Sequence, residues 1–405
     1  MAAARLDKRR TVATVGGIQP RTRAPMPQTD IGSSDRLLAE LRSWVEHETP
    51  TTDARAVNGL LDRCQAELAG VGAAIERLPG RDGFGDTLIA RTPGEGAPVM
   101  VAGHVDTVWD HGTLAKSMPW RVEGDRAHGP GIYDMKAGSF FAFHSVREIL
   151  RQGTKTRRPI TLLLTPDEEV GSPTSRAPIE AAAKGACAVL IPEPAGGPQG
   201  ACVTGRKGTG GFTVAIEGRS AHAGGNWSEG RSAVVALSRL ILAVHGLTDL
   251  DRGITTNVAP VWGGTRPNVI PPEAGCRIDF RAPSLEVAEQ VVAAIRALAG
   301  EEAHGMEGIR ISIEGGLNRP PFPETPAGLA LFETARAIAG RQGYSLPRQH
   351  RGGGSDGNFT AVMGIPTLDG LGCTGAGAHA PDEHIRWAEL APRCATLCEL
   401  LETLG

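Results

Sequence analysis

The chain has 405 residues, of which 40% are hydrophobic and 21% are charged, values typical of a soluble globular protein. At this length two domains are the default expectation, because a single hydrophobic core rarely organises so many residues. The net charge of -3 gives no electrostatic attraction for nucleic acid or an anionic membrane, and no apolar run approaches the roughly 20 residues that span a bilayer.

The first 33 residues are predicted to form a disordered basic tail, since they are Pro-rich and nearly free of large apolar side chains. The stretch that follows Lys8, Arg9 and Arg10 is too polar to be the apolar part of a signal peptide. The seven Cys are scattered without a CxxC pair, which is typical of buried, reduced thiols. These features favour a cytoplasmic protein.

Regular patterns begin near Ser34. Apolar residues at helical spacing predict helices over 37–48 and 56–75. Short apolar runs bounded by turn residues then predict strands, with helices between them. The strands are expected within 98–104, 159–169 and 186–194, and the helices over 139–153 and 178–185. Strands that are apolar on both faces and alternate with helices favour a parallel sheet covered by helices on each side.

The pattern changes near 205–211. Within 212–315 the periodicities predict strand, helix, strand, strand, helix and strand, in that order. This order is typical of a ferredoxin-like unit, an antiparallel sheet with two helices on one face. After Arg319 the alternating pattern resumes, with a helix predicted over 329–343, and it continues to the end of the chain. The smaller domain is therefore predicted to be inserted into the larger one.

Acidic and histidine residues follow the predicted strands of the larger domain or lie in its glycine-rich turns. These residues are His104, Asp106, Asp134, Glu168, Glu169, Glu193 and His379. In open α/β sheets, ligands bind beyond the carboxyl ends of the strands, so we expect these side chains to meet in one crevice. Asp106 lies two residues beyond His104 in an extended segment, and it can therefore orient the imidazole ring.

Two His and three carboxylates suit a dinuclear zinc centre, because zinc takes imidazole and carboxylate ligands and catalytic sites keep a position open for water. Two metals about 3.5–4 Å apart need a bridging group, which one carboxylate can provide. In the adjacent pair Glu168 and Glu169, one carboxylate can bind metal while the other accepts a proton from the water. The pattern thus indicates metal-assisted hydrolysis.

These stretches resemble the M20 metallopeptidase family, in the family's order and over nearly all of the chain after the tail. They are GHVDTV (103–108), GIYDMKAG (131–138), TPDEEVGS (165–172), IPEP (191–194), GRSAHAG (218–224), RPNVIP (266–271) and GAHAPDEHI (377–385). The resemblance implies an α/β fold, with a phosphorylase/hydrolase-like zinc-peptidase domain, built on a mixed sheet between helices, over 34–206 and 318–405. It also implies an inserted ferredoxin-like lid at 207–317 that forms a homodimer.

The resemblance implies two Zn²⁺ per chain, although Co²⁺ or Mn²⁺ suits the same ligands. Carried over by position, His104 and Glu193 would hold one zinc. Glu169 and His379 would hold the other, and Asp134 would bridge the two.

The remaining roles also follow from the resemblance. Glu168 would be the general base that activates the metal-bridging water or hydroxide, and Asp106 would support His104. The stretches GRKGTGGF, DFRAP, NRPPF and RGGGSDGN look most like the glutamate carboxypeptidase branch, the carboxypeptidase G2-like enzymes. In that branch His222 would polarise the scissile carbonyl. The implied substrate-binding residues are Asn268 and Arg281 for the substrate carboxylate, and Arg319, Gly354 and Ser355 for the substrate tail.

The predicted function is therefore hydrolysis of the amide bond in a small N-acyl amino acid or peptide with a free carboxylate. An alternative within the family is an acetylornithine deacetylase or aminoacylase type of N-deacylation. A distant alternative is a serine hydrolase, because GGSDG around Ser355 matches the nucleophile pattern G-x-S-x-G. That reading leaves the residues at the strand ends without a use. A non-enzymatic binding protein is disfavoured, because every ligand position and the base are present.

Overall fold

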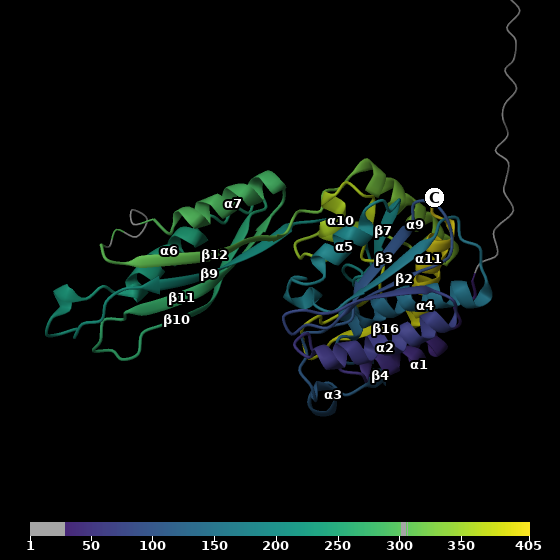
Figure 1. Ribbon diagram of the computed structural model, residues 1–405, viewed down its shortest axis with the longest axis horizontal. Coiled ribbons are helices and arrows are strands. Elements are labelled where there is room, and N and C mark those ends of the chain that lie inside the picture. The colour runs from purple at the N-terminus through teal and green to yellow at the C-terminus, as the bar shows by residue number, and fades with distance from the viewer. Residues whose placement is uncertain (1–28, 301–304, 306) are drawn as a thin grey trace, which may run out of the picture.

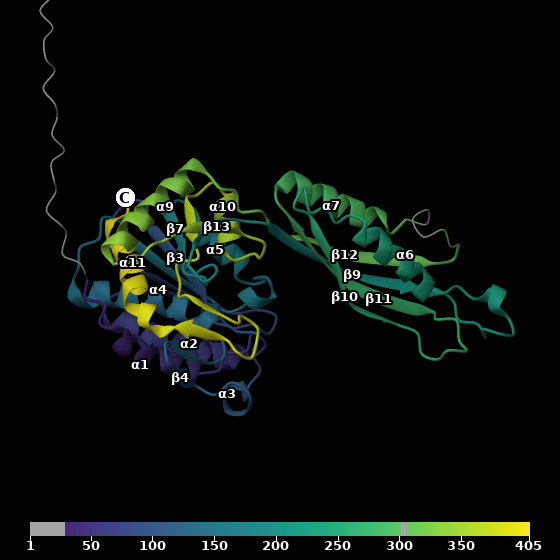
Figure 2. The ribbon, with the colours of Figure 1, turned by 180° about the vertical axis from the view of Figure 1, so that it is seen from behind.

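The computed structural model describes residues 29–300, 305 and 307–405. Figure 1 shows two lobes joined by a narrow connection, and Figure 2 shows the same separation from behind. We call the larger lobe, residues 29–207 and 320–405, the body, and the smaller lobe, residues 208–319, the lid. Among the described residues, none of the helices is both long and apolar enough to cross a bilayer.

The body is built on an eight-stranded mixed sheet with the strand order β1-β2-β6-β3-β7-β14-β8-β13. The strands are β1 Ala74–Leu78, β2 Thr87–Arg91, β3 Val99–His104, β6 Ile160–Thr165, β7 Ala188–Ile191, β8 Cys202–Arg206, β13 Arg348–Arg351 and β14 Thr367–Asp369. The four central strands β6, β3, β7 and β14 are parallel, whereas β1, β2 and β8 pair antiparallel with their inner neighbours. The mixed sheet is confirmed, and the expectation of a wholly parallel sheet is wrong toward its two edges.

Helices cover both faces of this sheet, as Figures 1 and 2 show. One face carries α1 Ser34–Val45, α2 Ala54–Gly70, α4 Ala137–Gln152, α9 Pro326–Arg341 and α11 Leu390–Thr403, and the other carries α5 Arg176–Ala183 and α10 Gly357–Val362. In β3, Val99 and Val101 pack into the first core and Met100 and Ala102 into the second, since successive side chains of a strand point to opposite faces. Burial on both faces explains the continuous apolar run in the sequence.

A small antiparallel sheet of four short strands, in the order β15-β16-β5-β4, lies in the same body. Its strands are β4 Arg121–Glu123, β5 Arg126–His128, β15 Gly375–Ala376 and β16 His384–Arg386. The body also contains the short helical turns α3 Thr113–Lys116, η1 Ile132–Lys136, η2 Glu168–Val170 and η4 Trp387–Glu389. Two of these turns, η1 and η2, carry residues of the candidate site.

The predicted helix over 56–75 is too long. Helix α2 ends at Gly70, and Gly72 then adopts a φ of 93°, a left-handed conformation that favours glycine. The chain continues as strand β1 from Ala74. The apolar residues of 73–75 fit the helical period, but the two glycines interrupt it.

The lid is a four-stranded antiparallel sheet in the order β10-β11-β9-β12, with helices α6 and α7 packed on one face. Its elements are β9 Gly208–Glu217, η3 Trp227–Glu229, α6 Ala233–His245, β10 Thr255–Gly263, β11 Glu273–Ala282, α7 Leu285–Ala297 and β12 Arg310–Arg319. The predicted ferredoxin-like order of strands and helices is confirmed.

The start of the chain differs from the prediction of a tail that extends to residue 33. Residues 1–28 lie outside the described residues, but 29–33 pack on the body. The Thr29 amide donates to Glu402 Oε1 at 2.8 Å, and the Ile31 carbonyl accepts from His144 Nε2 at 3.0 Å. Ile31 is only 6% exposed, so its apolar side chain belongs to the core and the tail prediction is wrong for 29–33.

Candidate active site

Residues from four separate segments meet where strands β3 and β6 end. Strand β3 ends at His104, and β6 ends at Thr165 just before turn η2. His104 Nε2 lies 3.4 Å from Asp134 Oδ1 and 3.8 Å from Glu193 Oε1. The parallel pairing of β3 with β6 and β7 brings the carboxyl ends of these strands to one edge of the sheet, which places these side chains together.

A second group of contacts involves His379. Its Nε2 atom lies 3.1 Å from Glu169 Oε2 and 3.5 Å from Asp134 Oδ2. Asp134 therefore directs one carboxylate oxygen toward His104 and the other toward His379. The structure thus brings together the residues that the sequence predicted at the strand ends.

Two polar atoms in this cluster, His104 Nε2 and Glu169 Oε1, are buried and have no hydrogen-bond partner among the residues that the structure describes. The other ring nitrogen of His104 lies 3.0 Å from the Asp106 carbonyl and 3.3 Å from Asp106 Oδ1. Both neighbours are acceptors, so Nδ1 carries a proton, and Nε2 is the ring nitrogen that faces Asp134 and Glu193. A buried polar atom without a partner costs about 1–3 kcal/mol, and a divalent cation satisfies both atoms.

The donor set fits a metal of the kind that binds nitrogen and oxygen ligands. His104, Asp134 and Glu169 each offer one ligand atom, and these atoms lie within 4.8 Å of one another. Imidazole nitrogen and carboxylate oxygen are ordinary zinc ligands. Together with the two unsatisfied atoms, this geometry makes the cluster a candidate metal centre.

Asp106 is fully buried and supports more than the histidine. Its Oδ1 atom accepts a hydrogen bond from the Glu168 amide at 3.2 Å, and its Oδ2 atom accepts from the Glu169 amide at 3.3 Å. Thr51 Oγ1 donates to Oδ2 at 2.7 Å. The carboxylate therefore orients both His104 and the turn that carries the adjacent glutamates. The sequence spacing predicted the contact of Asp106 with His104 but not its contacts with the backbone amides of Glu168 and Glu169.

Burial and neighbouring carboxylates raise the pKa of the three glutamates of this cluster, Glu168, Glu169 and Glu193. Burial raises the pKa of Glu168 to about 7, and burial together with the charges of Asp134 and Glu168 raises the pKa of Glu193 well above its usual value. Asp134 behaves differently. Burial opposes its ionisation, but contacts with His104 and His379 outweigh that effect and hold its pKa below the usual range. The hydrogen bonds that His379 donates to Asp134 and Glu169 in turn raise the pKa of this histidine to about 10.

The guanidinium group of Arg319 lies against Glu168. Its Nη2 atom donates to Glu168 Oε1 at 2.8 Å and to the Glu168 carbonyl at 3.0 Å, and its Nη1 atom donates to Asp356 Oδ1 at 2.9 Å. Asp356 also accepts from Ser172 Oγ, which itself accepts from Arg319 Nη2, so Asp356 and Ser172 hold the guanidinium in place. Arg319 thus has other partners than the substrate tail that the resemblance implies.

A cleft of about 490 Å³ opens beside this cluster and is lined by both lobes. Glu168, Glu169 and His379 of the body line it, together with Arg281 of the lid. Asp279, two residues earlier in β11, binds the Arg281 guanidinium through Nε at 2.9 Å and Nη2 at 2.7 Å. Residues two apart in a strand lie on the same face of the sheet. This spacing would have allowed the contact between Asp279 and Arg281 to be predicted from the sequence.

Gly354 lines the same cleft, but Ser355 does not. Ser355 is fully buried, and its hydroxyl donates to Asp369 Oδ2 at 2.5 Å while accepting from the Gly357 amide. Asp369 also accepts from Arg206 Nε at 2.7 Å. Among the described residues no histidine binds this hydroxyl, so the structure gives the serine-nucleophile alternative no support, and the substrate-tail role of Ser355 stays a prediction.

His222 and Asn268 lie in the connections of the lid and do not line the cleft. Strand β9 leaves the body at Gly208 and ends at Glu217, so His222 lies beyond a strand of about 30 Å. Its Nδ1 atom accepts from the amides of Gly224 and Gly225 at 3.1 and 3.0 Å, and its neighbour Ala223 donates to the Asn268 carbonyl. In this arrangement of the lobes neither residue reaches His104.

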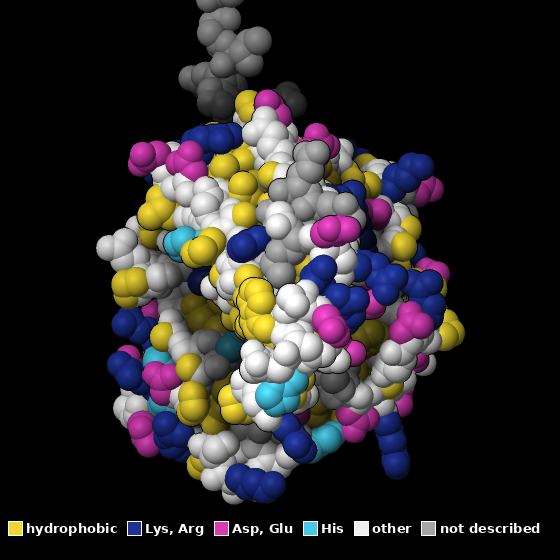
Figure 3. Space-filling model, turned by 90° about the vertical axis from the view of Figure 1, so that its left-hand side faces the viewer, with side chains coloured by type: hydrophobic (Ala, Val, Ile, Leu, Met, Phe, Trp, Pro, Cys, Tyr) yellow, Lys and Arg dark blue, Asp and Glu magenta, His cyan; other side chains and the backbone are white. Residues whose placement is uncertain are grey.

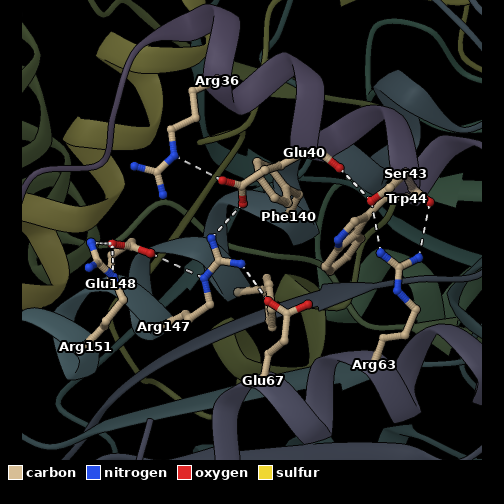
Figure 4. Close-up of a pocket in the computed structure, with 11 residues that line it drawn as sticks. Arg36, Glu40, Ser43, Trp44, Arg63, Glu67, Phe140, Arg147, Glu148 and Arg151 are labelled. Carbon is tan, nitrogen blue, oxygen red and sulfur yellow. Dashed lines mark hydrogen bonds and ion pairs between the residues drawn. The ribbon is translucent and has the colours of Figure 1, made fainter. Parts of the chain in front are cut away.

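A second cavity, of about 540 Å³, lies between helices α1, α2 and α4 (Figure 4). Its walls carry charged residues that we call the helix-groove cluster. The cluster consists of Arg36, Glu40, Arg63, Glu67, Arg147, Glu148 and Arg151. Arg147 lies between the carboxylates of Glu40 and Glu67 at 2.6 Å from each, and Arg151 binds Glu148 at 2.5 Å. Each carboxylate in this groove therefore has a guanidinium partner.

Comparison with known proteins gives one consistent result. The model of peptidase family M20/M25/M40 matches residues 100–403. Carboxypeptidase G2 of Pseudomonas sp. (strain RS-16) is 30% identical over 91% of this chain and 89% of its own length. A succinyl-diaminopimelate desuccinylase of Gluconacetobacter diazotrophicus is 28% identical over 92% of this chain and 98% of its own.

Solved structures share the fold. A tripeptidase from Staphylococcus aureus aligns with a TM-score of 0.74 at 20% identity, over 92% of this chain and 99% of its own. An M20 family metallo-carboxypeptidase from Sulfolobus solfataricus aligns with a TM-score of 0.71 at 17% identity, over 91% of this chain and 99% of its own.

Proposed function

The chain belongs to peptidase family M20/M25/M40, and from this premise we propose that it is a dinuclear zinc hydrolase acting on N-acyl amino acids or peptides with a free carboxylate. Family membership makes it a metal-dependent hydrolase. The observation that carries the finer proposal is the pair of buried, unsatisfied atoms, His104 Nε2 and Glu169 Oε1, in a cluster where Asp134 lies 3.4 Å from His104 and 3.5 Å from His379.

We assign the metal-holding residues from these contacts and from the family motifs. His104 and Glu193 would hold one cation, His379 and Glu169 the other, and Asp134 would contact both. Such cations would polarise the scissile carbonyl and acidify a water molecule. Zinc is the ordinary choice for this ligand set, with cobalt or manganese as substitutes.

Glu168 is the proposed general base. It lies next to the cleft, and its Oε2 atom is 4.0 Å from His104 Nε2, farther than the proposed ligand atoms of Asp134 and Glu193. Arg319 and Asp106 hold its side chain and its amide in place. From this position Glu168 accepts a proton from the attacking water and delivers it to the leaving amine.

Arg281 is the proposed binding group for the substrate carboxylate. One edge of its guanidinium is occupied by Asp279, and no hydrogen bond from its Nη1 atom is seen among the described residues, while the side chain lines the cleft. A guanidinium suits a carboxylate because its N–H groups form charge-assisted hydrogen bonds. The carboxypeptidase relative supports an amino acid as the leaving group, whereas the desuccinylase relative supports removal of an acyl group.

We propose further that the lid forms a homodimer. Val261 and Trp262 of the edge strand β10 are 51% and 46% exposed, and Leu242 of α6 is 71% exposed. Figure 3 views the molecule from the lid end, where apolar side chains lie among polar and charged ones. An unpaired edge strand with exposed apolar residues is a ready surface for pairing with a second copy. His222 would then act at the cleft only after the lobes close or from a partner chain.

The test combines metal removal with a substrate panel. Dialysis against a chelator should abolish hydrolysis of N-acyl glutamates, dipeptides or N-succinyl amino acids, and Zn²⁺ should restore it. Serine-directed reagents should have no effect. Activity that survives in a folded preparation shown by elemental analysis to be metal-free would contradict the proposal.

The substrate carboxylate is tested separately. Arg281→Met should raise KM for free-carboxylate substrates by about 10- to 100-fold, the loss of one charged hydrogen-bonding group. The matched variant Asp279→Asn keeps the arginine and removes the carboxylate that occupies it, so its KM should not rise. Equal activity of the wild type on an amidated substrate would remove Arg281 from this role.

A further inference from the structure

Glu383 is a fully buried carboxylate with four N–H donors and no place in the mechanism above. Its Oε1 atom accepts from the amides of Tyr133 and Asp134 at 2.9 and 3.1 Å. Its Oε2 atom accepts from the Gly131 amide at 2.9 Å and from Trp109 Nε1 at 2.8 Å. Each oxygen thus receives two hydrogen bonds, which is the full acceptor capacity of an ionised carboxylate.

Three of these donors belong to the backbone of turn η1 and the residue before it. Amides at the beginning of a helical turn lack partners within the turn, and a carboxylate is well suited to them. Because Asp134 is itself one of the donors, Glu383 fixes the main chain from which the Asp134 carboxylate projects between His104 and His379.

The same loop carries His379. Glu383 follows it by four residues, and strand β16 begins at the next residue, His384. Strand β16 pairs with β5, which leads into the Gly131 turn, and His384 lies opposite His128 in this pairing. One short loop therefore supplies the His379 side chain and also the anchor for Asp134, although 249 residues separate Asp134 from Glu383.

We infer that Glu383 is a positioning residue for the metal centre, because it sets the Asp134 carboxylate at a fixed place relative to His379. The inference rests on the proposed function, which makes Asp134 and His379 metal ligands. Burial of a carboxylate is unfavourable unless it is fully hydrogen-bonded, and no cation forms a salt bridge with Glu383 among the described residues. The position of this buried carboxylate is explained by its hydrogen bonds to the backbone of the turn that carries Asp134.

The first test is Glu383→Gln. Glutamine has nearly the same size as glutamate, but its amide nitrogen donates instead of accepting. Whichever oxygen this nitrogen replaces, it faces two N–H donors, so two of the four hydrogen bonds to residue 383 are lost. Partners that orient metal ligands change metal affinity by roughly 10- to 100-fold when they are removed. We expect a loss of this size in the affinity for Zn²⁺, measured by competition with a chromophoric chelator. The absorption spectrum of the Co²⁺-loaded protein should change, and kcat should fall while KM changes little.

A second variant guards against a failure to fold. Trp109→Phe removes only the side-chain donor to Glu383 and leaves the carboxylate and three backbone contacts. Its affinity for Zn²⁺ should fall measurably but by less than that of Glu383→Gln.

The matched control is Glu148→Gln. Glu148 is equally buried and binds Arg151 and Gln152, but it lies in the helix-groove cluster. This change should lower the free energy of unfolding and leave the affinity for Zn²⁺ unchanged. Wild-type affinity in Glu383→Gln, or in Trp109→Phe where the first variant does not fold, overturns the inference, as does an equal loss in Glu148→Gln. A wild-type protein that binds no metal overturns the proposed function as well.

Discussion

The body contains two clusters of buried or half-buried carboxylates that differ in what surrounds them. In the helix-groove cluster, Arg147 binds Glu40 and Glu67, and Arg151 binds Glu148. The side chains of His144 and Arg147 lower the pKa of Glu40 to about 2, against the effect of burial. In the candidate metal centre the carboxylates face histidines and one another, and burial raises the pKa of Glu168 to about 7.

The two clusters differ in whether their buried polar atoms have partners within the protein. Every carboxylate of the helix-groove cluster has a guanidinium partner, so the cluster joins three helices without any ligand (Figure 4). The candidate metal centre keeps His104 Nε2 and Glu169 Oε1 unsatisfied. We therefore expect changes in the first cluster to affect stability and changes in the second to affect metal binding and turnover.

The largest effect is expected for Glu168→Gln. General acid–base catalysis contributes about 10²- to 10⁴-fold, so kcat should fall by that factor. Bound metal, measured by elemental analysis, should stay at the wild-type level because Glu168 is not a proposed ligand. A variant with nearly wild-type kcat would remove Glu168 from the mechanism.

The next effect is stabilisation by metal. A ligand that binds only the folded state at 100 times its Kd adds about 2.7 kcal/mol to the free energy of unfolding. Denaturant unfolding of chelated and Zn²⁺-loaded protein should differ by about this amount. The variant Arg147→Met should show the same increment, since the two clusters share no residue and distant sites add independently. An increment that disappears in Arg147→Met would mean that the clusters are coupled.

Arg147→Met alone should lower the free energy of unfolding without changing kcat. The Arg147 side chain is 14% exposed and contacts Glu40, Glu67 and Glu148. Removal of one partner from a buried pair costs 3–5 kcal/mol and from an exposed pair below 1, so we expect roughly 2 kcal/mol here. Arg36→Met is the control, because within the described part of the chain this 49% exposed side chain forms one ion pair, an i,i+4 pair with Glu40, worth about 0.3–0.5 kcal/mol. Similar losses in both variants would contradict the central position of Arg147.

The last effect is a pH dependence of the stability. The folded-state pKa of Glu40, about 2, is below its usual value of 4.5, so its contribution to stability is present above the usual value and is lost as pH falls through about 2. The difference in unfolding free energy between wild type and Glu40→Gln should therefore shrink between pH 4.5 and 2. A difference that stays constant over this range would show that ionisation of Glu40 contributes nothing.

The position of the site could be predicted because it follows from topology. His104 comes directly after an apolar run, and Glu168 and Glu169 come just beyond another, so parallel pairing of the strands brings them to one edge of the sheet. The order of elements in the lid was readable for a similar reason, since its amphipathic helices and strands have distinct periods.

The hydrogen bonds and ion pairs between residues far apart in the sequence could not be predicted in this way. Arg319 binds Glu168 across 151 residues, and the burial of Ser355 against Asp369 depends on packing that no local pattern records. The four donors to Glu383 are of the same kind, because three are backbone amides whose directions are set only by the folded turn. Sequence reasoning therefore located the strand-end residues and the support of His104 by Asp106, but it missed the contacts of Arg319 with Glu168 and of Glu383 with the Asp134 turn.

The lid meets the body beside the reacting groups. Thr209 of β9 pairs with Arg319 of β12, so the two connections between the lobes are neighbours, and Arg319 contacts Glu168. The ten residues of β12 extend away from this pivot over roughly 33 Å. On such a lever arm, a swing of about 10° carries the far tip through an arc of about 6 Å, while the root at Arg319 barely shifts. The outer loops of the lid can therefore move far while Glu168, the proposed general base, stays in place.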